Sequence, residues 1–250
     1  MGKTIVMFDL FGTILDDVKI DFGKGMDYIY ERFFKDFCTR EVFDVCDKEY
    51  LEYFRARQHE NYEVCFAKEE IPMLCGKVGR EEFELSPEDE WIMADIVNEE
   101  TVFDDVHRML ETFANAGIPM YVLSNSTFRR GVLCKLLEKH DVLRYFEYVW
   151  SSADFGKRKP DRSFFDQAVE TILLTHQEAR REDIFFIGDN YNYDAFGGFN
   201  AGLNATWLNR PDLPGACGHP VNVVKNMDDF TEYVLSYGKN GLKTDSGVKK

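Results

Sequence analysis

The sequence predicts an α/β fold, a doubly wound parallel sheet of Rossmann-like type that carries an inserted all-helical cap domain. Short, continuously apolar runs end in polar or small residues, as expected of strands that are buried on both faces of a parallel sheet. Between these runs, apolar residues recur at helical spacing, and this alternation is typical of doubly wound folds. A long charged and aromatic segment near the N-terminus interrupts the alternation and indicates the insertion.

The strands are expected at the short apolar runs. These runs cover residues 4–9, 119–125, 147–152, 184–189 and 204–209. The stretch before the second run has apolar residues at helical spacing from Val102 to Phe113, and it stops at Gly117, a residue type that commonly ends helices. The stretches 129–143 and 161–174 show the same helical pattern.

The insertion is expected at residues 17–98. This segment is rich in charged and aromatic residues at helical spacing and contains few strand-like runs. Ser86, followed by Pro87 and several acids, predicts the start of a helix within it. We therefore expect a helical cap at 17–98 on an α/β core made of residues 1–16 and 99–250, with the functional site in the cleft between them.

The composition limits the classes of function. The 250 residues carry a net charge of −15, and an acidic chain repels phosphate backbones, so nucleic acid is not an expected partner. No run approaches the roughly 20 apolar residues of a membrane-spanning helix, so no membrane partner is expected either. The six cysteines form no Cys-x-x-Cys pair and no signal-peptide pattern is present, which predicts a cytoplasmic protein with reduced thiols. The five histidines lack the spacing of zinc ligands.

Polar side chains stand at the ends of the predicted strands and in the connections between them. In chain order they are Asp9, Ser124, Asn125, Lys159, Asp189 and Asp194. The carboxyl ends of parallel strands meet at one edge of the sheet, where ligands bind. Crowded carboxylates repel one another unless a cation neutralises them, and Mg²⁺ prefers such oxygen ligands. A lysine can hold a phosphoryl group and a carboxylate can accept one as an aspartyl-phosphate, so we expect phosphoryl chemistry here.

Two of the motifs that carry these residues lie in the first half of the chain. The stretch "FDLFGT" resembles the first motif of the haloacid dehalogenase-like hydrolase superfamily, in which a nucleophilic aspartate, here Asp9, precedes a threonine, here Thr13. The stretch "VLSNS" resembles the second motif, with Ser124 as the hydroxyl that binds phosphate.

The remaining two motifs follow in the order of the same superfamily. The stretch "KPD" resembles the third motif, whose lysine, here Lys159, stabilises the nucleophile and the transferred group. The stretch "IFFIGDNYNYD" resembles the fourth, whose acids, here Asp189 and Asp194, hold Mg²⁺. The motifs extend over essentially the whole chain, and the helical cap of the superfamily, inserted after the first motif, matches residues 17–98.

The resemblance implies a mechanism and a set of ligands. In the superfamily, a phosphoryl group passes in line to the first aspartate and water then hydrolyses the intermediate. The implied Mg²⁺ ligands are Asp9, the carbonyl oxygen of Phe11, and Asp189, with Asp194 binding directly or through water. The implied substrate is a small phosphorylated molecule. The residues expected to contact it are Phe11, Gly12 and Asn125.

Phe11 departs from the pattern of the superfamily. Its phosphatases have a second aspartate there, which protonates the leaving oxygen, and general acid–base help of this kind contributes roughly 10²–10⁴-fold. One interpretation is a Mg²⁺-dependent phosphohydrolase whose substrates have good leaving groups or bring their own proton. The other is a 2-haloacid dehalogenase, a metal-free class with an aromatic residue at this position.

The fourth motif favours the phosphohydrolase. Dehalogenases of that class show a small polar residue where this chain keeps Asp189, and uncompensated acids beside Asp9 would oppose a carboxylate substrate. A non-catalytic relative that binds a phosphorylated ligand or a protein is the third interpretation, because one catalytic residue is missing. Asp9, Thr13 and Lys159 are nevertheless all retained.

Overall fold

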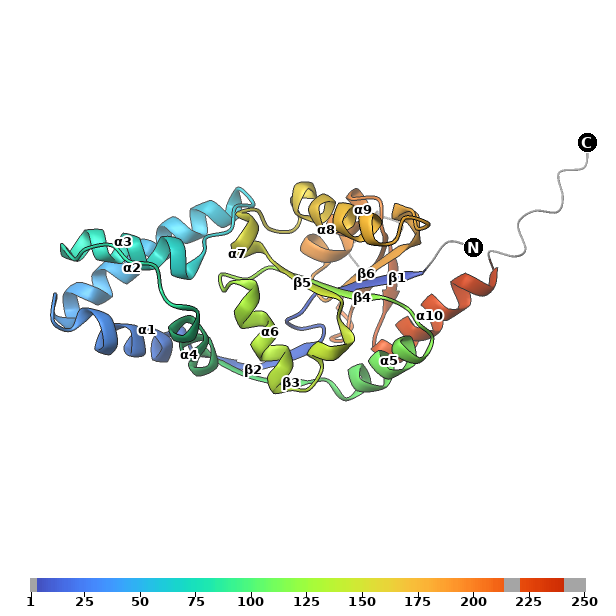
Figure 1. Ribbon diagram of the computed structural model, residues 1–250, viewed down its shortest axis with the longest axis horizontal. Helices are drawn as coiled ribbons and strands as arrows, with labels where there is room; N and C mark the ends of the chain where they lie inside the picture. Colours follow the sequence, from blue (N-terminus) through green and yellow to red (C-terminus); the bar gives the residue numbers. More distant parts are fainter. Residues whose placement is uncertain (1–3, 214–220, 241–250) are drawn as a thin grey trace, which may run out of the picture.

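The centre of the molecule is a six-stranded sheet whose paired strands all run parallel. The computed structural model describes residues 4–213 and 221–240. The strand order is β5-β4-β1-β6-β7-β8, so the first strand of the chain lies in the interior of the sheet. Figure 1 shows helices on both sides of this sheet and a helical region at one end of the molecule. The α/β fold expected from the sequence is confirmed.

The strands coincide with the predicted apolar runs. Their bounds are β1 Ile5–Phe8, β4 Met120–Ser124, β5 Tyr148–Ser151, β6 Ile184–Gly188 and β7 Asn204–Leu208. The short edge strand β8, Asn222–Val224, was not indicated by the sequence. It pairs only with β7 within the described residues, and only Val224 of its three residues is buried, so it lacks a continuous apolar run.

The two faces of the sheet bury alternate residues of each strand. Val6 and Phe8 pack on the side that is covered by α5 (Asp104–Asn115), α6 (Arg130–Lys139) and α10 (Met227–Asn240). Ile5 and Met7 pack on the opposite side with α8 (Arg162–Thr175). Burial on both faces is the physical reason for the continuously apolar strands.

The helical region comprises four helices and two short π-helical segments. They are α1 Phe22–Ile29, η1 Tyr30–Phe34, α2 Arg40–His59, η2 Phe66–Glu70, α3 Ile71–Val78 and α4 Pro87–Val97. The start of α4 is as predicted, because the Ser86 side chain accepts a hydrogen bond from the Asp89 amide. We call this region, residues 21–97, the cap.

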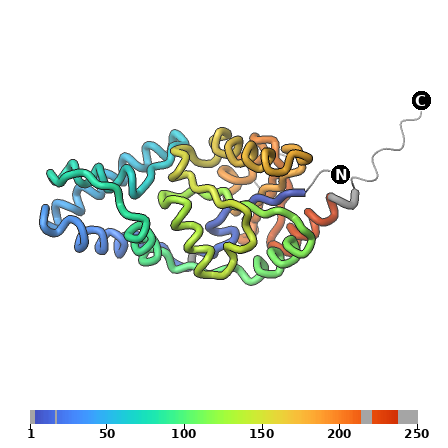
Figure 2. The backbone as a smooth tube through the Cα atoms, in the orientation of Figure 1, coloured from blue at the N-terminus to red at the C-terminus, as the bar shows by residue number. Residues whose placement is uncertain are grey.

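A two-stranded ribbon joins the cap to the core. Strand β2, Leu15–Ile20, pairs antiparallel with β3, Asn98–Val102. The chain leaving the core and the chain returning to it therefore lie side by side, as Figure 2 shows. The ribbon was not indicated by the sequence, because Val18 and Ile20 are exposed and no continuously apolar run results. The predicted domain boundaries, at 16/17 and 98/99, fall inside this ribbon.

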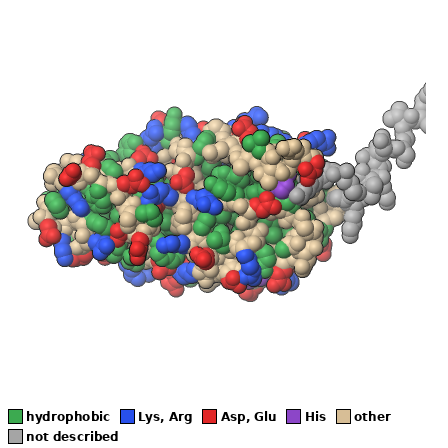
Figure 3. Space-filling view, in the orientation of Figure 1, with side chains coloured by type: hydrophobic (Ala, Val, Ile, Leu, Met, Phe, Trp, Pro, Cys, Tyr) green, Lys and Arg blue, Asp and Glu red, His purple; other side chains and the backbone are tan. Residues whose placement is uncertain are grey.

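The remaining elements are short. They are the helices α7 (Ser152–Phe155) and α9 (Gly197–Asn200), the 3₁₀ segments Leu143–Tyr145 and Arg181–Asp183, and the π-helical segment η5 (Tyr191–Phe196). None of the helices in the described residues is long and apolar enough to cross a bilayer. Acidic and basic side chains are interspersed over the face drawn in Figure 3.

The described cysteines carry free thiols. They are Cys38, Cys46, Cys65, Cys75 and Cys134. Cys217 lies outside the described residues.

Candidate active site

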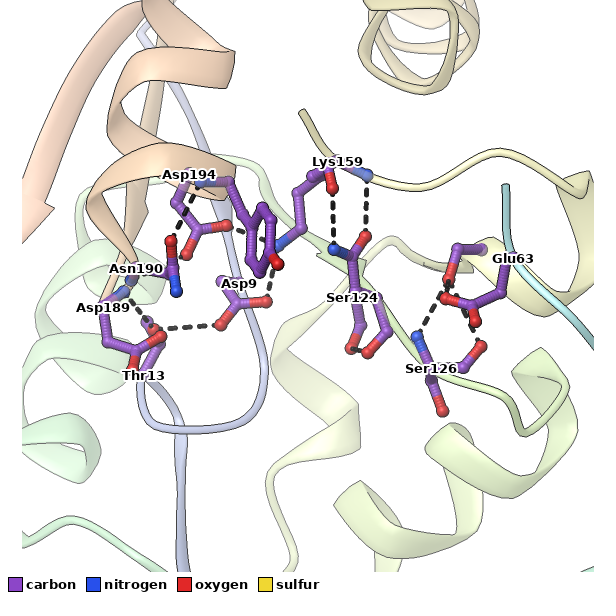
Figure 4. Close-up of polar contacts among 12 residues, drawn as sticks. Asp9, Thr13, Glu63, Ser124, Ser126, Lys159, Asp189, Asn190 and Asp194 are labelled. Carbon is purple, nitrogen blue, oxygen red and sulfur yellow. Dashed lines mark hydrogen bonds and ion pairs between the residues drawn. The ribbon is translucent and has the colours of Figure 1, made fainter. Parts of the chain in front are cut away.

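The predicted site residues converge at the carboxyl edge of the sheet. Asp9 follows β1 directly, Ser124 is the last residue of β4, and Asp189 follows β6 directly. Because β1 lies between β4 and β6, the three strand ends are neighbours. Figure 4 shows Asp9 between the Asp189–Asp194 pair on one side and Ser124 on the other.

The turn after β1 is held by its own backbone and by Thr13. The Leu10 carbonyl accepts hydrogen bonds from the amides of Ile14 and Leu15 at 2.8 and 2.9 Å. The Thr13 hydroxyl is buried, donates to Asp9 Oδ2 at 3.3 Å and accepts from the Asp189 amide at 3.1 Å. Thr13 thus joins the end of β1 to the end of β6.

Gly12 lets the two strand ends approach closely. Its φ of +75° lies in the left-handed region that favours glycine. A Cβ at this position would stand 2.6 Å from Asp189 Oδ2, so a side chain would displace that carboxylate. Gly12 therefore shapes the site through its lack of a side chain, while its predicted contact with substrate stays a prediction.

Lys159 is the basic centre of the site. Its ammonium is buried and lies 2.6 Å from Asp9 Oδ1 and 2.7 Å from Asp194 Oδ1. Burial lowers the pKa of Lys159, but the charges of Asp194 and Asp9 outweigh burial and leave the pKa raised. The lysine is therefore a fixed positive charge between the two carboxylates.

Asn125 holds the backbone of Lys159. Its side-chain oxygen accepts from the Lys159 amide at 2.8 Å, and its side-chain nitrogen donates to the Lys159 carbonyl at 3.0 Å. Asn125 also borders the cavity described below. Ser124 is fully buried, and its hydroxyl donates to the Asn125 carbonyl at 3.5 Å, a weak contact that leaves the hydroxyl adjustable.

Asp194 is positioned by the turn that follows β6. Its Oδ2 accepts from the Asn190 amide at 3.0 Å, and its own amide donates to the Asn190 carbonyl at 2.9 Å. Burial raises the pKa of Asp194, and the charge of Asp9 adds to that effect, whereas Lys159 opposes it. Two neighbouring carboxylates thus disfavour each other's charged form, as expected where a cation is needed.

The acids fit a divalent metal ion. Single carboxylate oxygens of Asp9, Asp189 and Asp194 all lie within 4.8 Å of one another. Lys159 neutralises one negative charge of the three, so a net negative charge remains for a cation. An all-oxygen donor set with this charge is the kind that Mg²⁺ binds. The predicted carbonyl ligand, that of Phe11, belongs to the turn after β1 and stays a prediction.

A cavity of about 320 Å³ opens beside this cluster, between core and cap. Phe11 and Asn125 line it on the core side, and Phe54 and Gln58 of α2 line it on the cap side. The Phe11 ring packs at the edge of the core instead of offering a proton donor. The predicted cleft between core and cap thus has a counterpart in the structure.

Glu63 and Arg158, which line the same cavity, were missed from the sequence. Glu63 is buried, accepts from the Ser152 hydroxyl at 2.6 Å, and lies 3.6 Å from the Arg158 guanidinium. Burial raises the pKa of Glu63, although Arg158 and Ser152 oppose the shift. Arg158 directly precedes Lys159 in "GKRKPD", which is a weak signal, whereas nothing in the sequence marks Glu63.

The cap contacts the core at several places besides Glu63. Near the cavity, the Phe66 amide donates to the Thr127 carbonyl at 2.9 Å. Farther away, Arg129 at the start of α6 donates to the buried carboxylate of Glu90 in α4, at 2.5 Å from Nε and 2.8 Å from its backbone amide. These contacts close the cap over the carboxyl edge of the sheet.

Comparison with known proteins identifies the family. The sequence profile of haloacid dehalogenase-like hydrolases matches residues 3–202, which include all the predicted site residues. The chain belongs to this family of hydrolases. One curated relative, pyrimidine 5′-nucleotidase YjjG of Escherichia coli (strain K12), is 34% identical over 73 residues, which cover 29% of this chain and 31% of the relative. The match thus spans less than a third of the length of that relative.

Solved structures with the same fold include several haloacid dehalogenase-like hydrolases. A 2-haloacid dehalogenase from Pseudomonas syringae pv. Tomato DC3000 matches with a TM-score of 0.63 and 18% identity, over 95% of this chain and 100% of that one. The putative hydrolase YfnB from Bacillus subtilis, bound to magnesium, matches with a TM-score of 0.56 and 17% identity, over 94% and 99%. A phosphatase from Thermococcus onnurineus matches with a TM-score of 0.55 and 16% identity, over 92% and 97%. At these identities the likeness shows the fold alone.

Proposed function

We propose that this haloacid dehalogenase-like hydrolase is a Mg²⁺-dependent phosphohydrolase that acts on a small phosphorylated metabolite through an aspartyl-phosphate on Asp9. The observation that carries the proposal is the cluster of Asp9, Asp189 and Asp194, whose oxygens lie within 4.8 Å of one another beside Lys159. Mg²⁺, when bound by these acids, supplies the positive charge that an anionic phosphoryl group needs in order to approach a carboxylate.

Four residues of the chain have separate roles in the proposed reaction. An Asp9 oxygen attacks phosphorus as the ester P–O bond breaks, and water then hydrolyses the acyl phosphate, which returns Asp9 and releases phosphate. Lys159 holds Asp9 in place and offers its charge to the transferred group. Ser124 donates its hydroxyl to a phosphoryl oxygen, and Thr13 fixes the orientation of Asp9.

Phe11 restricts the leaving group. No proton donor stands at its position, so a substrate must have a leaving oxygen of low pKa or receive a proton from elsewhere. Among the described residues lining the adjacent cavity, Glu63 has a raised pKa but is already bonded to Ser152 and close to Arg158. We therefore expect acyl and aryl phosphates to be better substrates than sugar phosphates.

The cavity supports a ring-bearing substrate. It is bordered by Phe11, Phe22, Phe54 and Phe128, and its volume of about 320 Å³ accommodates a ring of nucleobase size. The curated relative is named as a pyrimidine 5′-nucleotidase, which makes pyrimidine nucleotides the first natural candidates, provided that their poor leaving oxygen receives a proton from elsewhere. The cytoplasmic location expected from the sequence belongs to the same proposal.

Dehalogenation is the second candidate, and Phe11 favours it, since halide leaves without a proton. The acids oppose it, because Asp189 and Asp194 beside Asp9 would repel the carboxylate of a 2-haloacid. Lys159 balances only one of the three acidic charges, so a net negative charge still faces the carboxylate of a 2-haloacid.

The test is phosphate release from acetyl phosphate, p-nitrophenyl phosphate, uridine 5′-monophosphate and glucose 6-phosphate, with Mg²⁺ and with chelator. We expect release that requires Mg²⁺ and falls steeply as the leaving-group pKa rises.

Asp189→Asn should weaken Mg²⁺ binding measured by calorimetry, whereas Asp36→Asn, the same change at an exposed position of the cap, should not. Release that is indifferent to chelation contradicts the metal. If no phosphate is released from any member of the panel but halide is released from 2-chloropropionate, dehalogenation is favoured. If neither phosphate nor halide is released, a non-catalytic protein is favoured.

A further inference from the structure

A second cavity, of about 340 Å³, lies inside the cap. Its walls are mainly apolar and include Met26 of α1, Leu51 of α2 and Phe66 of η2. Phe22, Phe54 and Thr127 line both this cavity and the one beside Phe11. The two spaces therefore adjoin, and a molecule held at Asp9 can extend from the first cavity toward the second. We call the second space the cap cavity.

Four polar side chains line the cap cavity: Asp47, Tyr50 and Glu70 of the cap, and Thr127 of the core. Tyr50 is 2% exposed, and its hydroxyl, which is close to the Glu70 carboxyl, makes no hydrogen bond of good geometry to any described residue. Its ring stacks on Phe54, with centroids 6.1 Å apart, so the position of the hydroxyl is set by packing. A buried hydroxyl without a partner is costly, and such a group commonly awaits a water molecule or a ligand.

Glu70 differs from the other buried acids of the described chain. Each of those pairs with a basic side chain: Asp9 and Asp194 with Lys159, Glu63 with Arg158, Asp89 with Arg32, Glu90 with Arg129, and Glu100 with Lys139. Glu70 has no ion pair with any described basic residue, and the side chains that act on its carboxyl are those of Asp47 and Tyr50.

The environment pushes both carboxyls toward the neutral form. Burial raises the pKa of Glu70 well above its usual value, and the charge of Asp47 adds to the shift. Burial likewise raises the pKa of Asp47, although a hydrogen bond with Glu70 opposes the shift. Two close acids of this kind disfavour each other's charged form, and neither carboxyl has an ion pair with a described basic residue.

We propose that the cap cavity is a binding subsite for a hydrogen-bond-donating nitrogen, an ammonium or an aromatic amino group, at the far end of an apolar ligand. Either nitrogen can donate hydrogen bonds to the carboxyls of Asp47 and Glu70, and an ammonium also brings a positive charge. The aromatic walls suit the same ligand, because cations are attracted to ring faces. An anionic or purely acceptor-bearing group would instead be repelled.

The proposal rests on the proposed function for its identification of the ligand as the leaving-group end of the substrate. On that basis, the preferred substrates are phosphate esters that carry an amino or ammonium nitrogen on an apolar or aromatic body. The far end is recognised by the cap, whereas the phosphoryl group is recognised by the core.

Binding alone tests the subsite without any turnover. Calorimetry compares benzylammonium with benzyl alcohol, and cytidine with uridine, two pairs in which the ammonium or the exocyclic amino group is replaced by an oxygen group. We expect the nitrogen-bearing member of at least one pair to bind about tenfold more tightly, because a hydrogen bond to a charged group contributes about 1.5–3 kcal/mol. The pair whose two members differ in affinity shows whether the cap cavity prefers an ammonium or an aromatic amino group.

Substitutions connect the preference to the cap cavity. Glu70→Gln should reduce the preference to about twofold or less, and Asp47→Asn, at a less buried position, should reduce it in the same direction even if the first variant fails to fold. Glu52→Gln is the matched control, because it removes one acid from the exposed side of the same helix α2. Equal binding of both members of each pair, or a preference that survives both cavity variants, overturns the proposal.

Kinetics separates the two proposals. If p-nitrophenyl phosphate is hydrolysed but cytidine 5′-monophosphate and an aminoalkyl phosphate show no advantage over their oxygen counterparts, the subsite fails and the phosphohydrolase stands. If no phosphate ester is hydrolysed while the nitrogen preference in binding persists and depends on Glu70, the subsite stands and the phosphohydrolase fails.

Discussion

Two buried acidic clusters in this molecule differ in how their charge is balanced. In the core, Asp9 and Asp194 share the ammonium of Lys159 at 2.6 and 2.7 Å. In the cap, Asp47 and Glu70 have no ion pair with a described basic residue and face an apolar cavity. The core cluster carries its own cation, whereas neither acid of the cap cluster has one within ion-pairing distance among the described residues.

The clusters also differ in what holds them. The core acids stand on or beside strand ends that neighbour each other in the sheet, and Thr13 and Asn190 lock their orientation. The cap acids come from α2 and η2, and helix-to-helix packing places them. The difference agrees with the two proposed roles, because a catalytic group must be held within a narrow geometry whereas a specificity subsite can adjust.

The largest effect is expected from Asp9→Asn. Removing the nucleophile should lower phosphate release by about 10⁴-fold or more, the range seen when a nucleophile is lost. Steady-state release of phosphate from acetyl phosphate measures the change, with Asp36→Asn as the control for loss of one negative charge. Substantial turnover in Asp9→Asn would show that the core cluster is not the reacting one.

Lys159→Met sharpens the comparison through stability. The substitution leaves Asp9 and Asp194 buried without their cation, so the free energy of unfolding in urea should fall by about 3–5 kcal/mol. Lys157→Met, at a partly buried lysine whose ion pair with Asp161 spans 3.5 Å, is the control and should change stability by less than about 1 kcal/mol. Similar losses of unfolding free energy in both variants would mean that Lys159 stabilises the core cluster no more than a partly exposed ion pair does.

Phe11→Asp should restore the missing proton donor. We expect hydrolysis of glucose 6-phosphate to rise by about 10²-fold, the lower end of general acid–base catalysis. Acetyl phosphate should gain little, because its leaving group departs without a proton. Phe11→Asn matches the shape without the acid, so a similar gain in that variant would assign the effect to space in the cavity.

Glu70→Gln is expected to have the smallest effect, and its pH dependence has a definite sign. The folded-state pKa of Glu70 is raised above its usual 4.5, by burial first and by Asp47 second. Its contribution to stability is therefore complete below about pH 4.5 and is lost as the pH rises from there through the folded-state pKa. The variant should become more stable than the native protein by about 1–3 kcal/mol at the upper end of that range.

Urea unfolding between pH 5 and 9 measures this difference between the variant and the native protein. Glu52→Gln, an exposed acid on α2, should show a difference that does not change with pH. A pH-independent difference for Glu70→Gln as well would mean that the cap acid is not held in its neutral form, and the contrast between the two clusters would disappear.

Much of the core could be predicted from local patterns. Each of the five apolar runs, at 4–9, 119–125, 147–152, 184–189 and 204–209, contains a parallel strand, because burial on both faces leaves a signal within a few residues. The motifs then placed Asp9, Ser124 and Asp189 at strand ends, and sheet topology made these neighbours. The ribbon β2–β3 was missed because its exposed residues break the apolar pattern.

The sequence by itself indicated the family, the α/β fold, and Asp9, Lys159 and Asp194 as candidate site residues. These depend on short motifs whose order along the chain follows the strands. Only the tertiary structure decided that Asn125 holds the backbone of Lys159, that Glu63 meets Arg158, and that Glu70 lacks a cation. Those facts concern contacts between segments far apart in the chain. Burial and charge balance arise from such contacts, and no local pattern records them.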